Sequence, residues 1–119
     1  MKTLETLGHP SKRTSFEYEG SVESGVTLLQ SGRPGIDAGF FRAALKQFAG
    51  QDVMGGFKED DPPKGGFGKW VQDKSGELNS RKLTPRHAPF MAAILCHEAA
   101  VESWLDGNAV WLRFPKPDR

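Results

Sequence analysis

The chain has 119 residues, of which 37% are hydrophobic and 26% are charged, and its formal net charge is +1. These values fit one globular domain with its own core and argue against a wholly disordered chain. They also exclude the strong overall positive charge of many dedicated nucleic-acid-binding proteins, so any such binding must use a local basic patch.

The cysteine content and the hydropathy pattern indicate the cellular compartment. The only cysteine is Cys96, so no internal disulfide can form, as is usual in a reducing compartment. No apolar run approaches the ~18 residues of a transmembrane helix, and residues 1–12 lack the apolar core of a signal peptide. We therefore expect a cytoplasmic protein that does not engage membranes.

The first part of the chain predicts a polar arm followed by a hairpin. Residues 1–13 are polar and contain a turn signal, so we expect a flexible N-terminal arm before a single domain over residues 14–119. Phe16 and Tyr18 alternate with glutamates, which is typical of a half-buried strand. Residues 26–29 predict a second strand that could pair with the first.

The signals for a helix over residues 37–49 agree with one another. Asp37 is a favourable N-cap, and Gly50 can end the helix in a left-handed conformation. Ile36 and Phe41 have the spacing of a hydrophobic staple. The apolar side chains recur at helical spacing on one face: Phe40, Phe41, Ala44, Leu45 and Phe48.

Residues 51–82 form the longest stretch without clear periodicity. The stretch holds two Gly-Gly-Phe sequences, at residues 55–57 and 65–67, and within it Phe67–Lys74 could form a short helix or strand. Loops of this length in a compact domain carry function more often than packing. We therefore expect a long functional loop that is rich in glycine and proline.

A second helix is predicted from Pro89 to Leu105. A helix that began near Thr84 would contain Pro89 in its interior, so a tight turn should come first. Helical mapping places large apolar side chains, among them Trp104 and Leu105, on one face and small ones on another. This pattern indicates burial on two sides, with Met91 and Leu95 facing outward. Gly107 then ends the helix, so the Asp-Gly pair here is interpreted as a helix stop rather than a hairpin turn.

Alternation over residues 110–114 predicts a final strand. We expect an α+β fold in which the N-terminal hairpin and this C-terminal strand form a small antiparallel sheet, with two main helices on one face. A winged-helix-like fold is the alternative, and it would need Phe67–Lys74 as a short middle helix.

Motifs for catalysis or cofactor binding are incomplete. The loop glycines lack the spacing of a phosphate-binding loop. His97 and Glu98 begin like a zinc-binding helix signature, but Val101 stands where the second histidine would be. Cys96 and His97 point about 100° apart on a helix, which does not suit a thiolate–imidazole pair. We expect no metal, no cofactor and no catalytic residue, which makes an enzyme the less favoured class.

The basic turn before the second helix, residues 81–87, is the main candidate binding site. It precedes a helix N-terminus, where free N–H groups and the helix dipole favour anions. Lysines of the loop would add charge, and Trp70 could stack on a base. The residues predicted to bind nucleic acid, as an accessory domain would, are Lys64, Lys69, Trp70, Arg81, Lys82, Thr84, Arg86 and His87.

Two other functions remain open. Phe57, Phe67 and Trp70 could instead contact a protein, which would make the chain an interaction module, or a small regulator or inhibitor of a larger assembly. His97, mapped among large apolar side chains, could line a ligand pocket or an enzymatic site, as could His87. A solvated charged turn and a core histidine are the structural alternatives. A monomer and a homodimer are both compatible with the sequence.

Overall fold

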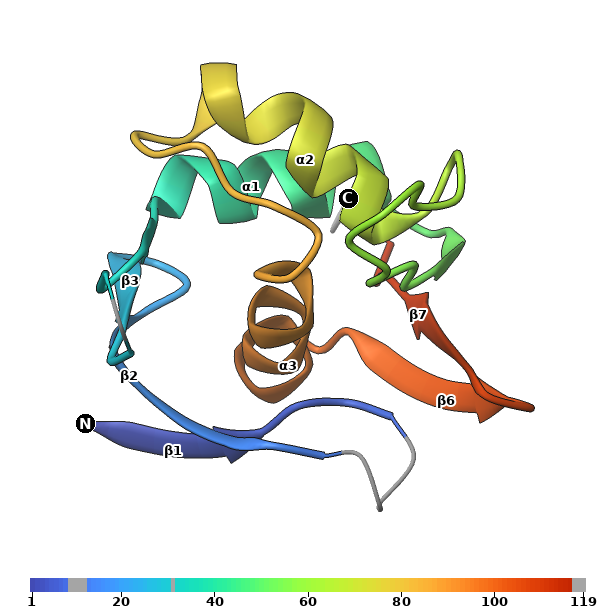
Figure 1. Ribbon diagram of the computed structural model, residues 1–119, viewed down its shortest axis with the longest axis horizontal. Coiled ribbons are helices and arrows are strands. Elements are labelled where there is room, and N and C mark those ends of the chain that lie inside the picture. Colours follow the sequence, from blue (N-terminus) through green and yellow to red (C-terminus); the bar gives the residue numbers. More distant parts are fainter. Residues whose placement is uncertain (9–12, 31, 117–119) are drawn as a thin grey trace.

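The computed structural model describes residues 1–8, 13–30 and 32–116. Over these residues the predicted α+β class is confirmed, with three helices and two antiparallel sheets (Figure 1). No helix in this part of the chain is long and apolar enough to cross a membrane. The helices are α1 (Ala38–Gln47), α2 (Phe67–Leu78) and α3 (Ala88–Glu98). The strands are β1 (Lys2–Glu5), β2 (Ser15–Ser21), β3 (Gly25–Leu28), β4 (Gly35–Ile36), β5 (Asp52–Met54), β6 (Glu102–Asp106) and β7 (Ala109–Arg113).

The first sheet is an antiparallel meander in the order β1-β2-β3-β4. Its central hairpin is the predicted one, and Phe16 and Tyr18 point from β2 into the core. Lys2–Glu5 pair with β2 as the edge strand β1, where a flexible arm was expected. An edge strand that is exposed at most positions has no apolar alternation, so residues 2–5 show no strand pattern in the sequence. Residues 9–12 of the expected arm lie outside the described residues.

The second sheet has the order β5-β7-β6. The C-terminal strand β7 therefore pairs with β5 and β6, and its predicted pairing with the N-terminal hairpin is wrong. The reason is local, because Gly107, with a φ of 63°, lies in a tight turn that folds β6 directly onto β7. Asp106-Gly107 is thus a hairpin turn and not the predicted helix stop.

Helix α3 is shorter than the predicted Pro89–Leu105 segment. It ends at Glu98, and Ala100 then adopts a left-handed φ of 60°. The chain leaves the helix there and continues as β6. As a result Trp104 and Leu105, which were predicted to be buried in the helix, are 37% and 38% exposed.

Helix α3 is the centre of the core. Figure 1 looks nearly along its axis and shows the first sheet, α1, α2 and the β6–β7 hairpin arranged around it. Met91 and Leu95 were predicted to face outward, but both are completely buried. Residues 91–95 are all apolar and all buried, so periodicity could not assign the faces of α3.

The segment of residues 51–82 is more regular than predicted, because it contains β5 and α2. The start of α2 packs closely on the loop before it. A Cβ atom at Gly68 would lie 2.1 Å from the carbonyl oxygen of Gly56, so a glycine is required there. Phe67 is completely buried next to Phe48 and Phe114, which fixes α2 on the core.

The turn that follows α2 is held by a hydrogen-bonded network on β4 and α1. Asp37 occupies the predicted N-cap position, but its carboxylate accepts hydrogen bonds from the N–H (2.6 Å) and hydroxyl (3.0 Å) of Ser80. The amide of Asn79 donates to the carbonyls of Gly35 (3.0 Å) and Arg81 (2.7 Å), and its oxygen accepts from the Asp37 N–H (2.7 Å). These bonds fix the position of the basic turn.

Candidate functional site

The predicted nucleic-acid-binding residues do not form one patch. Five of them lie together in the turn before α3: Arg81, Lys82, Thr84, Arg86 and His87. Lys69 and Trp70 belong to the first turns of α2, whereas Arg81 follows its last turn, so the length of the helix separates them. Lys69 also forms an ion pair with Asp73 at 3.2 Å. Lys64 is exposed in the loop that precedes α2.

The N-terminus of α3 offers few donors to an anion. The N–H of His87 donates to the Thr84 carbonyl (2.9 Å), and the N–H of Ala88 donates to the Pro85 carbonyl (3.2 Å). Pro89, in the first turn, has no N–H. The N–H of Ala88 is therefore used and that of Pro89 is missing, which weakens the predicted attraction for phosphate.

The imidazole of His87 acts as an acceptor within the turn. Its Nδ1 accepts a hydrogen bond from the backbone N–H of Thr84 at 3.0 Å, so the neutral ring carries its proton on Nε2. Burial lowers the pKa of His87, and the positive charges of Arg81 and Arg86 lower it further, against an opposing effect of Glu59. His87 therefore adds little positive charge at neutral pH, and the cations of this turn are Arg81, Lys82 and Arg86.

The predicted pocket histidine His97 is exposed in the last turn of α3. Helical mapping placed it among large apolar groups that would have continued along the helix to Trp104. Because α3 ends one residue after His97, those groups do not enclose it.

The loop aromatics predicted to contact a partner pack inward instead. Trp70 stacks on Phe40, with ring centroids 4.9 Å apart and an interplanar angle of 14°. Phe67 belongs to the buried core, and Phe57 packs against it. Because these rings pack against the core, little of their surface is left for binding a partner.

The outer face of the second sheet carries a different and more exposed set of side chains. Side chains alternate between the two faces of a strand, so residues in register share a face. One cross-strand row is Asp52, Arg113 and Glu102, from β5, β7 and β6. The next row is Met54, Trp111 and Trp104, and the last pairs Ala109 with Asp106. We call these eight residues the outer face.

Two tryptophans and one arginine form the centre of the outer face. The rings of Trp104 and Trp111 stack with centroids 6.4 Å apart, and the guanidinium of Arg113 lies 5.0 Å from the centre of the Trp104 ring. Arg113 is held in place because its Nε and Nη atoms donate to the two carboxylate oxygens of Asp52, at 2.8 and 3.2 Å. The hydrogen bonds from Arg113 lower the pKa of Asp52.

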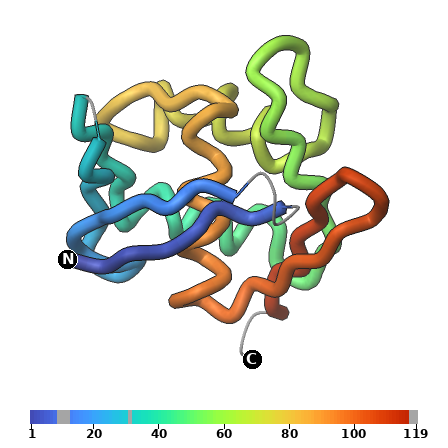
Figure 2. Tube along the Cα trace, turned by 60° about the horizontal axis from the view of Figure 1, so that its bottom comes forward, coloured from blue at the N-terminus to red at the C-terminus, as the bar shows by residue number. Residues whose placement is uncertain are grey.

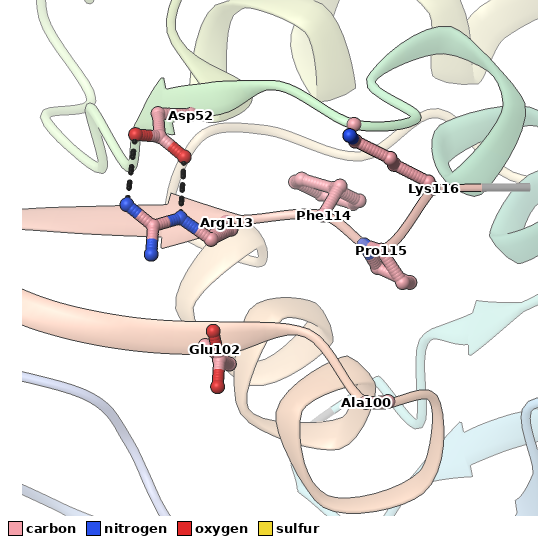
Figure 3. A pocket seen from close by; sticks show the side chains of 8 residues that line it. Asp52, Ala100, Glu102, Arg113, Phe114, Pro115 and Lys116 are labelled. Carbon is pink, nitrogen blue, oxygen red and sulfur yellow. Dashed lines mark hydrogen bonds and ion pairs between the residues drawn. The ribbon is translucent and has the colours of Figure 1, made fainter.

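A pocket of about 370 Å³ adjoins the charged row of the outer face (Figure 3). Asp52 and Arg113 meet on its wall, and Glu102 lies on the neighbouring strand β6. Lys116 and Pro115 form the side that follows β7. The outer face therefore combines exposed aromatic surface with a charged hollow at one end.

The sequence did contain one signal for this surface. An Asp-Gly pair is a strong hairpin signal, and a hairpin turn at Asp106-Gly107 would have placed Trp104 and Trp111 opposite each other on paired strands. The apolar residues before it continued the helical pattern and obscured that signal.

No family model, no curated protein and no solved structure matches this chain.

Proposed function

We propose that this chain is a protein-interaction module that binds a polypeptide partner through the outer face and the adjoining edge of β6. This agrees with one of the functions left open by the sequence, but it uses different residues. Phe67 and Trp70 stabilise the core, whereas Trp104 and Trp111 are presented on the second sheet.

One observation carries the proposal. All five residues of β6 are exposed, although the strand includes Trp104 and Leu105. Edge strands usually carry features that prevent pairing with other chains, and large apolar side chains on such a strand mark a binding surface. Tryptophan and arginine, the two residue types at the centre of the outer face, are enriched at the energetic centres of protein interfaces.

The charge of the outer face favours a polypeptide over a nucleic acid. Its three acids, Asp52, Glu102 and Asp106, and its one arginine give a net charge of −2. Nucleic-acid binding requires cations that neutralise the phosphates, whereas this negatively charged face would repel the phosphates. Stacked tryptophans alone would not compensate for that repulsion.

A selection of random displayed peptides on the folded protein tests the proposal. We expect enriched peptides that bind the wild type and the Leu78→Ser variant equally, since Leu78 is an exposed apolar residue far from β6 in the chain. The same peptides should bind Trp104→Ser about tenfold or more weakly. The proposal fails if no peptide is enriched, or if every enriched peptide binds Trp104→Ser as well as it binds the wild type.

Nucleic-acid binding is retained as a second candidate because three cations gather in the basic turn. Arg81, Lys82 and Arg86 are exposed, and the first and last are close enough to lower the pKa of His87. Arg81 is partly committed, since its guanidinium donates to the Gly32 carbonyl at 2.7 Å.

Polarization measurements with labelled single-stranded DNA and RNA test this second candidate. Binding through the basic turn should weaken steeply with added salt and fall in the Lys82→Ala/Arg86→Ala variant. It should be unchanged in Trp104→Ser. Absence of binding at low salt would remove nucleic acid from consideration.

A further inference from the structure

Two cross-strand rows of the outer face end at β6 in acids that form no ion pair with the described residues. In the first row the charges alternate from Asp52 through Arg113 to Glu102. Arg113 forms its two hydrogen bonds with Asp52 and attracts Glu102 only through its charge. In the last row Asp106 is opposite Ala109. Among the described residues, neither Glu102 nor Asp106 forms an ion pair. A strand added beside β6 would place its own side chains next to both acids, and cations at those positions would be favoured.

The backbone of β6 is equally incomplete on that side. In the described part of the chain β6 pairs with β7 alone and forms the edge of its sheet. An edge strand presents unpaired N–H and C=O groups that can accept an added strand. In Figure 2 the β6–β7 hairpin lies at the periphery of the molecule.

We infer that the partner is an extended, cationic segment of a polypeptide that adds to the edge of β6 as a fourth strand. This inference rests on the proposed function and names its ligand. The segment has one cation opposite Glu102, an apolar or aromatic side chain opposite Trp104, and one cation opposite Asp106. Its pattern is therefore cation, any residue, apolar, any residue, cation, and opposite-charge pairs across strands favour this register.

A second copy of this chain fits the edge poorly. Two-fold antiparallel pairing centred on Trp104 would place Glu102 of each copy opposite Asp106 of the other. Like charges directly opposite one another destabilise a strand pair. The same acids that attract a cationic segment therefore oppose self-association through β6.

The edge strand β1 of the first sheet is a weaker candidate for the same role. The strand is mostly polar, and its one large apolar residue, Leu4, is partly buried against the core. Lys2 is occupied with the carboxylate of Glu98 at 3.2 Å. The combination of exposed apolar surface and unmatched charge belongs to β6.

Two labelled synthetic peptides test the inference. One has a Lys-Thr-Ile-Thr-Lys centre, and the other has glutamate in place of both lysines. In polarization titrations with the full chain we expect the lysine peptide to bind about tenfold or more tightly than the glutamate peptide. The Glu102→Lys/Asp106→Lys variant should reverse this preference. The Glu17→Lys/Glu19→Lys variant, which changes two exposed acids on β2, should keep it.

A third peptide tests backbone pairing separately from charge. It carries the lysines but has N-methyl groups on alternate residues, which removes the N–H groups that would bond to β6. We expect it to bind about tenfold or more weakly than its unmethylated form. Equal binding of the two would overturn strand addition, and a charge preference that does not reverse in the β6 variant would overturn the assignment to Glu102 and Asp106.

Failure of this inference can be distinguished from failure of the proposed function. If the lysine peptide does not bind, but displayed peptides are selected whose binding depends on Trp104, the cationic-strand inference is wrong and the interaction module stands. If neither the designed nor the displayed peptides bind in a Trp104-dependent way, both are wrong. The inference would also be overturned if a single-stranded oligonucleotide displaced a peptide that is bound at Trp104.

Discussion

Glu98 connects the end of α3 to the first sheet. Its carboxylate accepts hydrogen bonds from the Tyr18 hydroxyl, the Val22 N–H (2.9 Å) and the Lys2 amine (3.2 Å). Burial raises the pKa of Glu98, but the hydrogen bonds from Tyr18, Val22 and Lys2 outweigh burial and lower it overall. Burial raises the pKa of Tyr18, and its hydrogen bond to Glu98 raises it further.

Glu98→Gln should lower the free energy of unfolding at neutral pH by about 1–2 kcal/mol, because charged hydrogen bonds are replaced by weaker ones. A lowered folded-state pKa contributes stability above the unfolded-state pKa, and this contribution is lost as pH falls through the folded-state value. The difference between wild type and variant should therefore shrink below the ordinary glutamate pKa of 4.5. Urea unfolding at several pH values measures it, with Glu17→Gln on β2 as the control. A pH-independent difference would contradict this role.

Two glycines of α2 should respond oppositely to alanine. Gly68 has no space for a Cβ atom, whereas a Cβ at Gly76 meets nothing within 4 Å. Gly68→Ala should destabilise the fold by about 2 kcal/mol or more, through overpacking against Gly56. Gly76→Ala should stabilise it by about 0.5–1 kcal/mol, because alanine favours a helix interior. Thermal and urea unfolding compare the two, and destabilisation by both would show that α2 lies differently on its loop.

The end of α3 is the element boundary on which the candidate site depends. Ala100 follows the C-cap Ala99 and has a φ of 60°, a conformation that favours glycine. Ala100→Gly should therefore stabilise the protein by about 0.5–1 kcal/mol. If the helix continued instead to Leu105, glycine would cost about 1 kcal/mol. Urea unfolding gives the sign directly, and Ala99→Gly, at a φ of −123°, is the control that should not stabilise.

The elements differ in how well the sequence predicts them, for physical reasons. Helix α1 has one buried face and recognisable end signals, so the prediction that it begins after the N-cap Asp37 was correct. Helix α3 is apolar all round and its left-handed stop is an alanine rather than a glycine, so its pattern continued without interruption into β6. The edge strand β1 has too little burial to show alternation.

The candidate site was only partly predictable for a related reason. The basic turn was visible because Arg81, Lys82 and Arg86 are close together in the sequence. The outer face joins β5 to β6 and β7, and Asp52 meets Arg113 only through that pairing. Residues so distant in the chain have no local pattern that unites them, and the mistaken helix hid the hairpin that presents them.

At the level of the whole molecule, the two candidate surfaces differ in charge. The basic turn lies before α3, and the acidic, aromatic outer face lies on the second sheet. A small chain of net charge +1 can thus present two surfaces of opposite sign. We propose that a polypeptide partner binds the second.

Self-association through β6 should be controlled by charge. The wild type should not pair through this edge, whereas Asp106→Lys would place a cation opposite Glu102 of a second copy and favour a dimer. Light scattering over a range of protein concentrations measures the mass, with Glu77→Lys on α2 as a matched charge change. A wild-type dimer that Trp104→Ser dissociates would contradict the unpaired edge.

The most direct test of the central claim is an amide NMR titration of the full chain with the lysine peptide. Binding to the β6 edge should change the amide signals of Glu102–Asp106 most, and it should slow hydrogen exchange of those β6 amides that face the added strand. Smaller changes should extend to β7 and end before the basic turn. Changes centred on Arg81–His87, or no slowing of exchange in β6, would contradict the claim.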